Sequence, residues 1–144
     1  MPVSSYELDQ EVFRLLKEGR AQLDNWQGAA SEIADYVASW GVERFWAMSR
    51  SPVLRGGAIP EAGQGSEEQR RYFPWAVARV VLCSIVRDDL GIKDTMTTEE
   101  FQNRFRQLNF NQQVLLTDLL IEISLAIQFW TMRMKDVKDS GNSV

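Results

Sequence analysis

Apolar residues recur every three to four positions over most of the chain, which is the spacing of amphipathic α-helices. The pattern predicts a first helix over residues 6–25 and a second over residues 29–48. Gly28 lies between them, so we expect the two helices to form an antiparallel hairpin. Gly41 is expected to bend the second helix, because glycine weakens a helix interior.

Start and stop signals divide the second half of the chain into further helices. Pro74 suits the first turn of a helix, and Gly91 suits a helix end. Residues 98–108 form a short amphipathic pattern, and Asn109 or Asn111 is expected to cap a last helix that ends near residue 136. Three capping boxes mark helix starts: Ser4 with Glu7, Ser66 with Gln69, and Thr97 with Glu100.

A long segment without helical spacing follows the second helix. Residues 49–66 read SRSPVLRGGAIPEAGQGS, and their glycines and prolines exclude a continuous helix or a central strand. Since strand-like alternation is nearly absent elsewhere, the predicted class is all-α: a single-domain bundle of five or six helices with a long Gly/Pro-rich loop after the second helix. The helical domain is expected to span residues 1–136, and the small polar residues 137–144 are expected to form a flexible tail.

The composition narrows the chemistry. The chain of 144 residues contains no histidine, which excludes histidine-based acid–base catalysis, Ser–His and Cys–His nucleophile pairs and imidazole metal ligands. Cys83, the single cysteine, lies in an apolar segment and is expected to be a buried, inert thiol. There is no nucleotide-binding motif either, so we expect no enzymatic activity, no cofactor and no metal site.

The charge pattern bears on partners and location. The formal net charge is −4, which disfavours broad electrostatic binding to nucleic acid. The arginines of the second half stand among acidic residues, a pattern typical of a solvated, mixed-charge face. The N-terminal residues are polar and show no signal-peptide pattern, and a lone cysteine forms no internal disulfide, so we expect a cytoplasmic protein.

The most apolar part of the chain is LLTDLLIEISLAIQFWTMRM, residues 115–134. Its length approaches that of a membrane-spanning helix. However, Asp118 and Glu122 lie inside it, and each would cost about 2.5–3.5 kcal/mol near the centre of a bilayer. We therefore expect no membrane span.

A helical wheel predicts how this last helix is oriented. One polar stripe is interpreted as its solvent face: Gln113, Thr117, Ser124, Gln128, Thr131 and Lys135. Asp118 and Glu122 lie outside that stripe, in a sector that they share with Leu115, Leu125, Phe129 and Arg133.

Burying an unpaired charge costs much free energy, so carboxylates amid apolar side chains must be paired or solvated. Three interpretations of Asp118 and Glu122 are considered. In the first they pair with an arginine from a neighbouring helix, such as Arg79, Arg87 or Arg104. In the second they form the rim of an apolar groove that accepts a partner helix, a tail or a second subunit. In the third they form a catalytic carboxylate pair, although the chain lacks the histidines of a di-metal helical site.

A second candidate surface is the aromatic cluster of the second helix. Trp40, Phe45 and Trp46 cannot share one helix face, so we expect at least one to be exposed or to be covered by the 49–66 loop. An exposed aromatic side chain would anchor a partner. The predicted partner-binding residues are Asp118, Glu122, Phe129, Arg133, Trp46 and, from the loop, Arg55.

Together these patterns predict a non-enzymatic helical adaptor or assembly factor, which binds a peptide, tail or helix of a larger protein assembly. A homodimer through the last helix is a variant of this hypothesis. The segment IADYVASWGVERFWAMS resembles the small all-helical subunits of RNA-guided CRISPR effector complexes, and this resemblance implies nucleic-acid binding as the alternative. The combination of helices with Trp-rich loops resembles small cyanobacterial accessory proteins, which implies a role in photosynthetic or carboxysome assembly.

Overall fold

The computed structural model describes residues 5–50 and 71–141, and this part of the chain forms helices without any strand. The predicted all-α bundle is therefore confirmed. In chain order the elements are α1 (Ser5–Glu18), the short 3-10 helix η1 (Arg20–Gln22), α2 (Leu23–Ala30), α3 (Ile33–Trp40), α4 (Val42–Ser49), α6 (Phe73–Leu90), α7 (Thr98–Gln107) and α8 (Phe110–Asp139). Most of the predicted Gly/Pro-rich loop lies outside the described residues.

The predicted hairpin of two long helices is wrong, because the chain breaks at Gly19 instead of Gly28. A Cβ at Gly19 would lie 2.5 Å from a ring carbon of Phe73, so a side chain at residue 19, just after α1, would require the Phe73 ring at the start of α6 to move. The indole N–H of Trp26 donates to the Gly19 carbonyl over 2.9 Å and holds the turn. Gly28, in contrast, lies inside α2.

Gly41 ends α3 and starts α4, which is a sharper break than the predicted bend. Its N–H donates to the carbonyl of Val37 over 2.9 Å and closes the last turn of α3. Its φ of 87° and ψ of 172° fall in a backbone region that is essentially restricted to glycine. The chain therefore changes direction here because residue 41 has no side chain.

Local capping signals position the later helices as predicted. The Thr97 hydroxyl accepts from the N–H of Glu100 over 3.1 Å, and the Glu100 carboxylate accepts from the N–H of Thr97. Asn109 and Gln112 form the same reciprocal pair at the start of α8. The boxes predicted at Ser4 and Ser66 lie outside the described residues.

Helix α6 is nearly surrounded by protein, as its apolar pattern predicts. Pro74 occupies its first turn, and Gly91 ends it in the left-handed conformation with φ 67°. Arg104 of α7 donates from Nε to the carbonyl of Leu90 over 2.7 Å, which ties α7 to this helix end. Ile92 then packs back into the core and is fully buried.

Arg79 connects α6 to the end of α4 inside the core. Its side chain is completely buried, and Nη1 donates to the carbonyl of Ser49, the last residue of α4. Burial lowers the pKa of Arg79 to about 10, and the nearby charge of Arg50 acts in the same direction. The group therefore remains a cation at neutral pH, and the carbonyl end of a helix is a favourable place for it.

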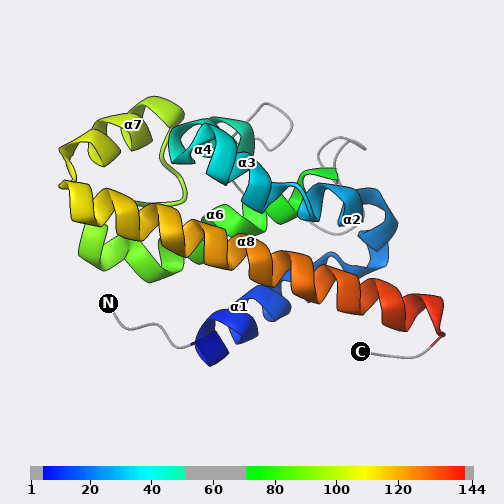
Figure 1. Cartoon of the computed structure of the whole chain (residues 1–144). Coiled ribbons are helices and arrows are strands. Elements are labelled where there is room, and N and C mark those ends of the chain that lie inside the picture. Colours follow the sequence, from blue (N-terminus) through cyan, green and yellow to red (C-terminus); the bar gives the residue numbers. More distant parts are fainter. Residues whose placement is uncertain (1–4, 51–70, 142–144) are drawn as a thin grey trace.

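The longest helix, α8, organises the bundle. It packs against α1, α2, α3 and α6, and in Figure 1 it crosses the front of the molecule from the α7 end to the α2 end. Its 30 residues correspond to a length of about 45 Å. It continues to Asp139, beyond the predicted end near residue 136.

Two glycine substitutions test this account of the helix breaks. Gly41→Ala is expected to lower the free energy of unfolding by about 1–3 kcal/mol, because a side chain strains the backbone at φ 87°. The matched control Gly28→Ala adds a Cβ that meets no atom within 4 Å inside α2, and it is expected to raise stability by up to about 1 kcal/mol. Urea unfolding followed by circular dichroism measures both, and equal losses would contradict the account.

Candidate functional site

Helix α8 presents one exposed face whose residues are spaced alternately by three and four positions. We call this face the α8 seam and define it as Leu115, Asp118, Glu122, Leu125, Phe129, Met132 and Asp136, all of which are exposed. The four apolar members have 42%, 52%, 55% and 56% of their surface exposed, in chain order. An average spacing of 3.5 residues keeps these side chains on one side of a helix, as in the seam of a coiled coil.

The predicted orientation of α8 is wrong, because part of the polar stripe faces the core. Ser124 and Thr131 are buried, Gln113, Thr117 and Gln128 are half-buried, and only Lys135 of the six is exposed. The hydroxyl of Ser124 donates to the Leu120 carbonyl over 2.7 Å, so its polar group is satisfied within the helix. A small side chain of this kind allows the neighbouring helices to approach closely.

The interpretation that Asp118 and Glu122 pair with an arginine of a neighbouring helix is also wrong. Both carboxylates are exposed, and neither belongs to an ion pair within residues 5–50 and 71–141. Two of these arginines donate to backbone carbonyls instead. Arg79 donates to the carbonyl of Ser49, and Arg104 donates to the carbonyl of Leu90. The acids are therefore solvated within this chain, amid exposed apolar side chains.

Phe129 and Arg133 lie beside these acids, as the sector predicts. The Phe129 ring packs edge-to-face on Trp130, with 5.0 Å between the centroids. The guanidinium of Arg133 lies 4.0 Å from the carboxylate of Asp136 in a pair that is exposed on both sides, so it contributes little to stability. The wheel missed Met132 and Asp136, although the alternating three–four spacing from Leu115 onwards would have found them.

Helix α1 borders the seam without covering it. Phe13 of α1 stacks on Trp130 at 4.8 Å, and the indole N–H of Trp130 donates to the carboxylate of Asp9 over 3.2 Å. Trp130 follows Phe129 directly and therefore points about 100° further round the helix. The contacts of α1 thus flank the seam on one side.

The other two predicted site residues do not belong to this surface. Trp46 has no exposed surface; its N–H donates to the carbonyl of Met96 over 3.0 Å and its ring stacks on Phe101 at 4.3 Å. No partner can reach Trp46 in this fold, so we leave it out of the site. The exposed aromatic of the cluster is Trp40, which lies under the guanidinium of Arg44. Arg55 lies outside the described residues.

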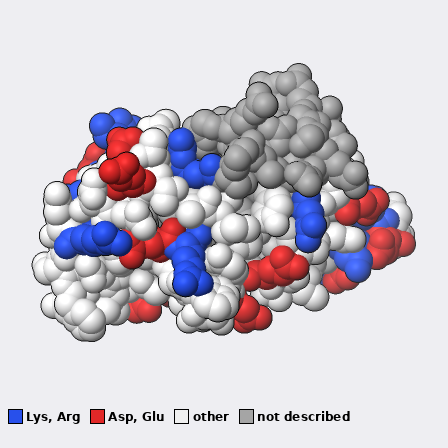
Figure 2. Space-filling model, turned by 90° about the horizontal axis from the view of Figure 1, so that it is seen from above, with Lys and Arg blue, Asp and Glu red and all other residues white. Residues whose placement is uncertain are grey.

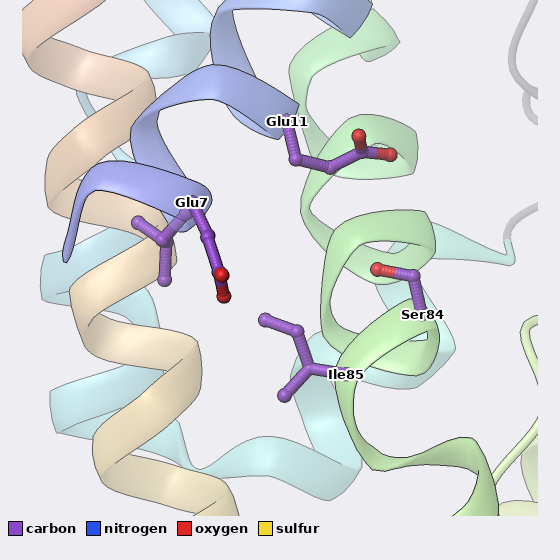
Figure 3. Close-up of a pocket in the computed structure, with 5 residues that line it drawn as sticks. Glu7, Glu11, Ser84 and Ile85 are labelled. Atoms are coloured by element: carbon purple, nitrogen blue, oxygen red, sulfur yellow. The ribbon is translucent and has the colours of Figure 1, made fainter. Parts of the chain in front are cut away.

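A cleft of about 400 Å³ lies between α1 and α6, and Figure 3 shows Glu7 and Glu11 of α1 facing Ser84 and Ile85 of α6 across it. The carboxylate of Glu11 accepts from Arg14 over 2.7 Å. The Ser84 hydroxyl donates to the carbonyl of Val81 over 2.7 Å, within its own helix. The serine is therefore not aligned with a general base, and the lining does not form a nucleophilic site.

The remaining groups with catalytic or ligating chemistry are dispersed or buried. Among the described residues no three Cys, Asp or Glu side chains are grouped as metal ligands. Cys83 is buried, and this burial raises the pKa of its thiol to about 12, with the charge of Asp94 acting in the same direction. Figure 2 shows Lys and Arg interspersed with Asp and Glu on the face seen from above, and Arg106 pairs with Glu43 at 3.3 Å.

By length and composition alone, α8 is the one helix of the described chain that could cross a membrane, which is weak evidence for a span. Only 39% of its most apolar window is buried. This is the feature that separates α8 from an ordinary core helix: much of its apolar surface meets solvent.

Comparisons with protein-family models, with curated proteins and with solved structures find no match to this chain. Evidence for a function therefore comes from the chemistry and geometry of the surface of this chain.

Substitutions on opposite faces of α8 test the observed orientation. Ile123→Ala is expected to lower the free energy of unfolding by about 2–5 kcal/mol, because Ile123 is fully buried and its truncation leaves a cavity. Leu125→Ala removes a similar side chain from the exposed seam and is expected to change stability by less than about 0.5 kcal/mol at low protein concentration. Chemical denaturation measures both. If Leu125→Ala lowered the free energy of unfolding as much as Ile123→Ala, Leu125 would belong to the core and the observed orientation of α8 would be wrong.

The pH dependence of stability tests the burial of Cys83. Above about pH 8.5 the thiol ionises in the unfolded chain, whereas its folded pKa of about 12 keeps it protonated in the native state. The native state then binds more protons, so the free energy of unfolding is expected to fall as pH rises, by up to about 1.4 kcal/mol per unit. Cys83→Ala should lack this slope in denaturation experiments under reducing conditions; parallel curves for the two proteins would show that the thiol is not buried.

Proposed function

We propose that this protein is a non-enzymatic helical adaptor or assembly factor, which binds a helix of a larger protein assembly along the α8 seam. The observation that carries the proposal is the exposure of Leu115, Leu125, Phe129 and Met132 on one face of α8, where Asp118 and Glu122 stand between Leu115 and Leu125. Exposed apolar surface that is bordered by charged side chains is typical of interaction sites. Here Arg133 lies beside the seam, and Asp118 and Glu122 lie within it.

The geometry of the seam favours a helix as the occupant. The seam is the convex face of one helix, and its three–four spacing matches the knobs-into-holes packing of two helices. An extended peptide would bind through backbone hydrogen bonds to a sheet edge, and the described part of the chain contains no sheet. A helix lying along α8 would cover the apolar members of the seam. Because Asp118 and Glu122 belong to the same face, that helix would have to offer cationic side chains to them.

Several features support a non-enzymatic role. The whole chain lacks histidine, which removes the commonest acid–base catalyst. The Cys83 thiol is buried, and burial holds its pKa at about 12, so at neutral pH it is not the thiolate that nucleophilic catalysis requires. Asp118 and Glu122 stand on an open helix face, where water is not excluded from a reacting group.

The same surface argues against nucleic acid and against a lipid bilayer as the occupant. Asp118, Glu122 and Asp136 would repel phosphate groups, and the chain has a net charge of −4. A bilayer would have to accept the same carboxylates, and the opposite face of α8 packs against four other helices. We therefore propose that α8 does not span a membrane and that its seam binds protein.

Affinity capture from native lysate tests this function. Phe129→Ala and Glu122→Ala each change one exposed seam residue, so the fold is expected to stay intact, which circular dichroism checks. We expect both variants to lose the same protein, identified by mass spectrometry, at least about tenfold relative to wild type. That protein is then purified, and its binding is measured directly with the wild type and with both variants.

The matched control is Trp40→Ala, because Trp40 is as exposed as Phe129 but lies on α3. Capture is expected to survive this change. If both seam variants retained every wild-type partner, or if Trp40→Ala lost the partner while they kept it, the seam would not be the binding site.

A further inference from the structure

The charges along α8 are distributed unevenly. Asp118 and Glu122 are the charged residues of the first half of the helix. The second half carries Arg133, Lys135 and Lys138 together with Asp136 and Asp139, which leaves an excess of one positive charge there. Asp118, Glu122 and Arg133 are all exposed, and Leu125 lies near the middle between the two groups. A helix with this distribution is complementary in charge to a reversed copy of itself.

Resting on the proposed function, in which the seam binds a helix, we infer that the helix is α8 of a second copy of this chain, packed antiparallel about a two-fold axis near Leu125. In this arrangement Leu125 meets Leu125 of the second copy. Asp118 lies within about one helical turn of Arg133 of the second copy, and the two-fold axis repeats that ion pair. Met132 comes within about one turn of Leu115 of the second copy.

The parallel alternative fails on the same residues. In a parallel pair each seam residue lies beside its own copy, so Asp118, Glu122 and Asp136 would each face an identical charge. Three such contacts between like charges disfavour the pairing. The antiparallel pair removes these three identical contacts, because it brings Asp118 of one helix close to Arg133 of the other. Asp136 of the second copy lies about one turn from the same Asp118, so the guanidinium of Arg133 stands between two carboxylates.

The surroundings of α8 leave room for this pairing. The contacts of α1 with Trp130 and the core contacts of α8 lie on other sides of the helix, and each member of the seam is exposed. Pairing would bury Leu115, Leu125, Phe129 and Met132, the apolar side chains that the monomer exposes on the seam. An isologous contact of this kind closes on itself as a dimer and generates no fibre.

Sedimentation equilibrium with charge-reversed variants tests the inference. The wild type is expected to form a dimer. In the antiparallel pair, Asp118→Arg brings an arginine beside Arg133 at two symmetric places. Arg133→Asp likewise brings an aspartate beside Asp118 at two places. Each variant should therefore raise the dimer Kd by about tenfold or more. The double variant, and an equimolar mixture of the two single variants, restore opposite charges and should restore dimerisation.

The matched control is Asp88→Arg, which makes the same change of charge at an exposed position of α6. Its dimer Kd is expected to equal that of the wild type. A wild-type chain that stays monomeric up to about 1 mM would overturn the self-pairing, because the free energy of association would then be weaker than about 4 kcal/mol. Seam-dependent capture of another protein would in that case still support the proposed function.

The other outcomes are equally decisive. A dimer that neither single variant weakens would place the interface away from the seam and overturn the inference. Single variants that dissociate the dimer without rescue by the double variant would exclude the antiparallel pairing of Asp118 with Arg133.

Discussion

The burial of one face of α8 is the contact on which the rest of the bundle depends. Its inward residues meet α1, α2, α3 and α6, and the apolar ones among them are Leu116, Leu119, Leu120, Ile123, Ile127 and Met134. Full burial of one such side chain contributes about 1.5–3 kcal/mol. Because the helix is about 45 Å long, this single stripe holds both ends of the fold together. The same geometry leaves the opposite stripe exposed in the part of the chain that the structure describes.

Signals that act over a few residues could be predicted from the sequence. The capping box at Thr97, the Asn109 cap and the left-handed Gly91 each depend on neighbours within one turn, and all three are present. The break at Gly19 could not be predicted from its neighbours within one turn, because the groups that contact Gly19 lie further along the chain: the Trp26 indole donates to its carbonyl and the Phe73 ring packs against it. The sequence predicted the break at Gly28 instead. Gly28 lies inside α2, where a Cβ at this position would meet no atom within 4 Å.

Part of the membership of the candidate site was predictable, but its environment was not: Trp46 is buried, and Met132 and Asp136 were missed. Asp118, Glu122, Phe129 and Arg133 do share one sector of α8, but that sector faces solvent. Polarity suggested the reverse, since hydroxyl side chains usually mark the wet side of a helix. Ser124 overturns that rule, because its hydroxyl is satisfied by its own helix and its small size suits close packing. The small size of Ser124, together with the three–four spacing of the seam residues, would have predicted the correct orientation of α8.

If one face of α8 is core and the other is an interface, so apolar a helix can carry Asp118 and Glu122, which form no ion pair among the described residues. The most direct test is a dilution series followed by methyl NMR. The account predicts that the methyl signals of Leu115, Leu125 and Met132 shift with protein concentration, while those of the fully buried Leu82 and Ile92 stay fixed. Concentration-independent signals from all three seam residues, or shifts that appear elsewhere and spare the seam, would contradict it.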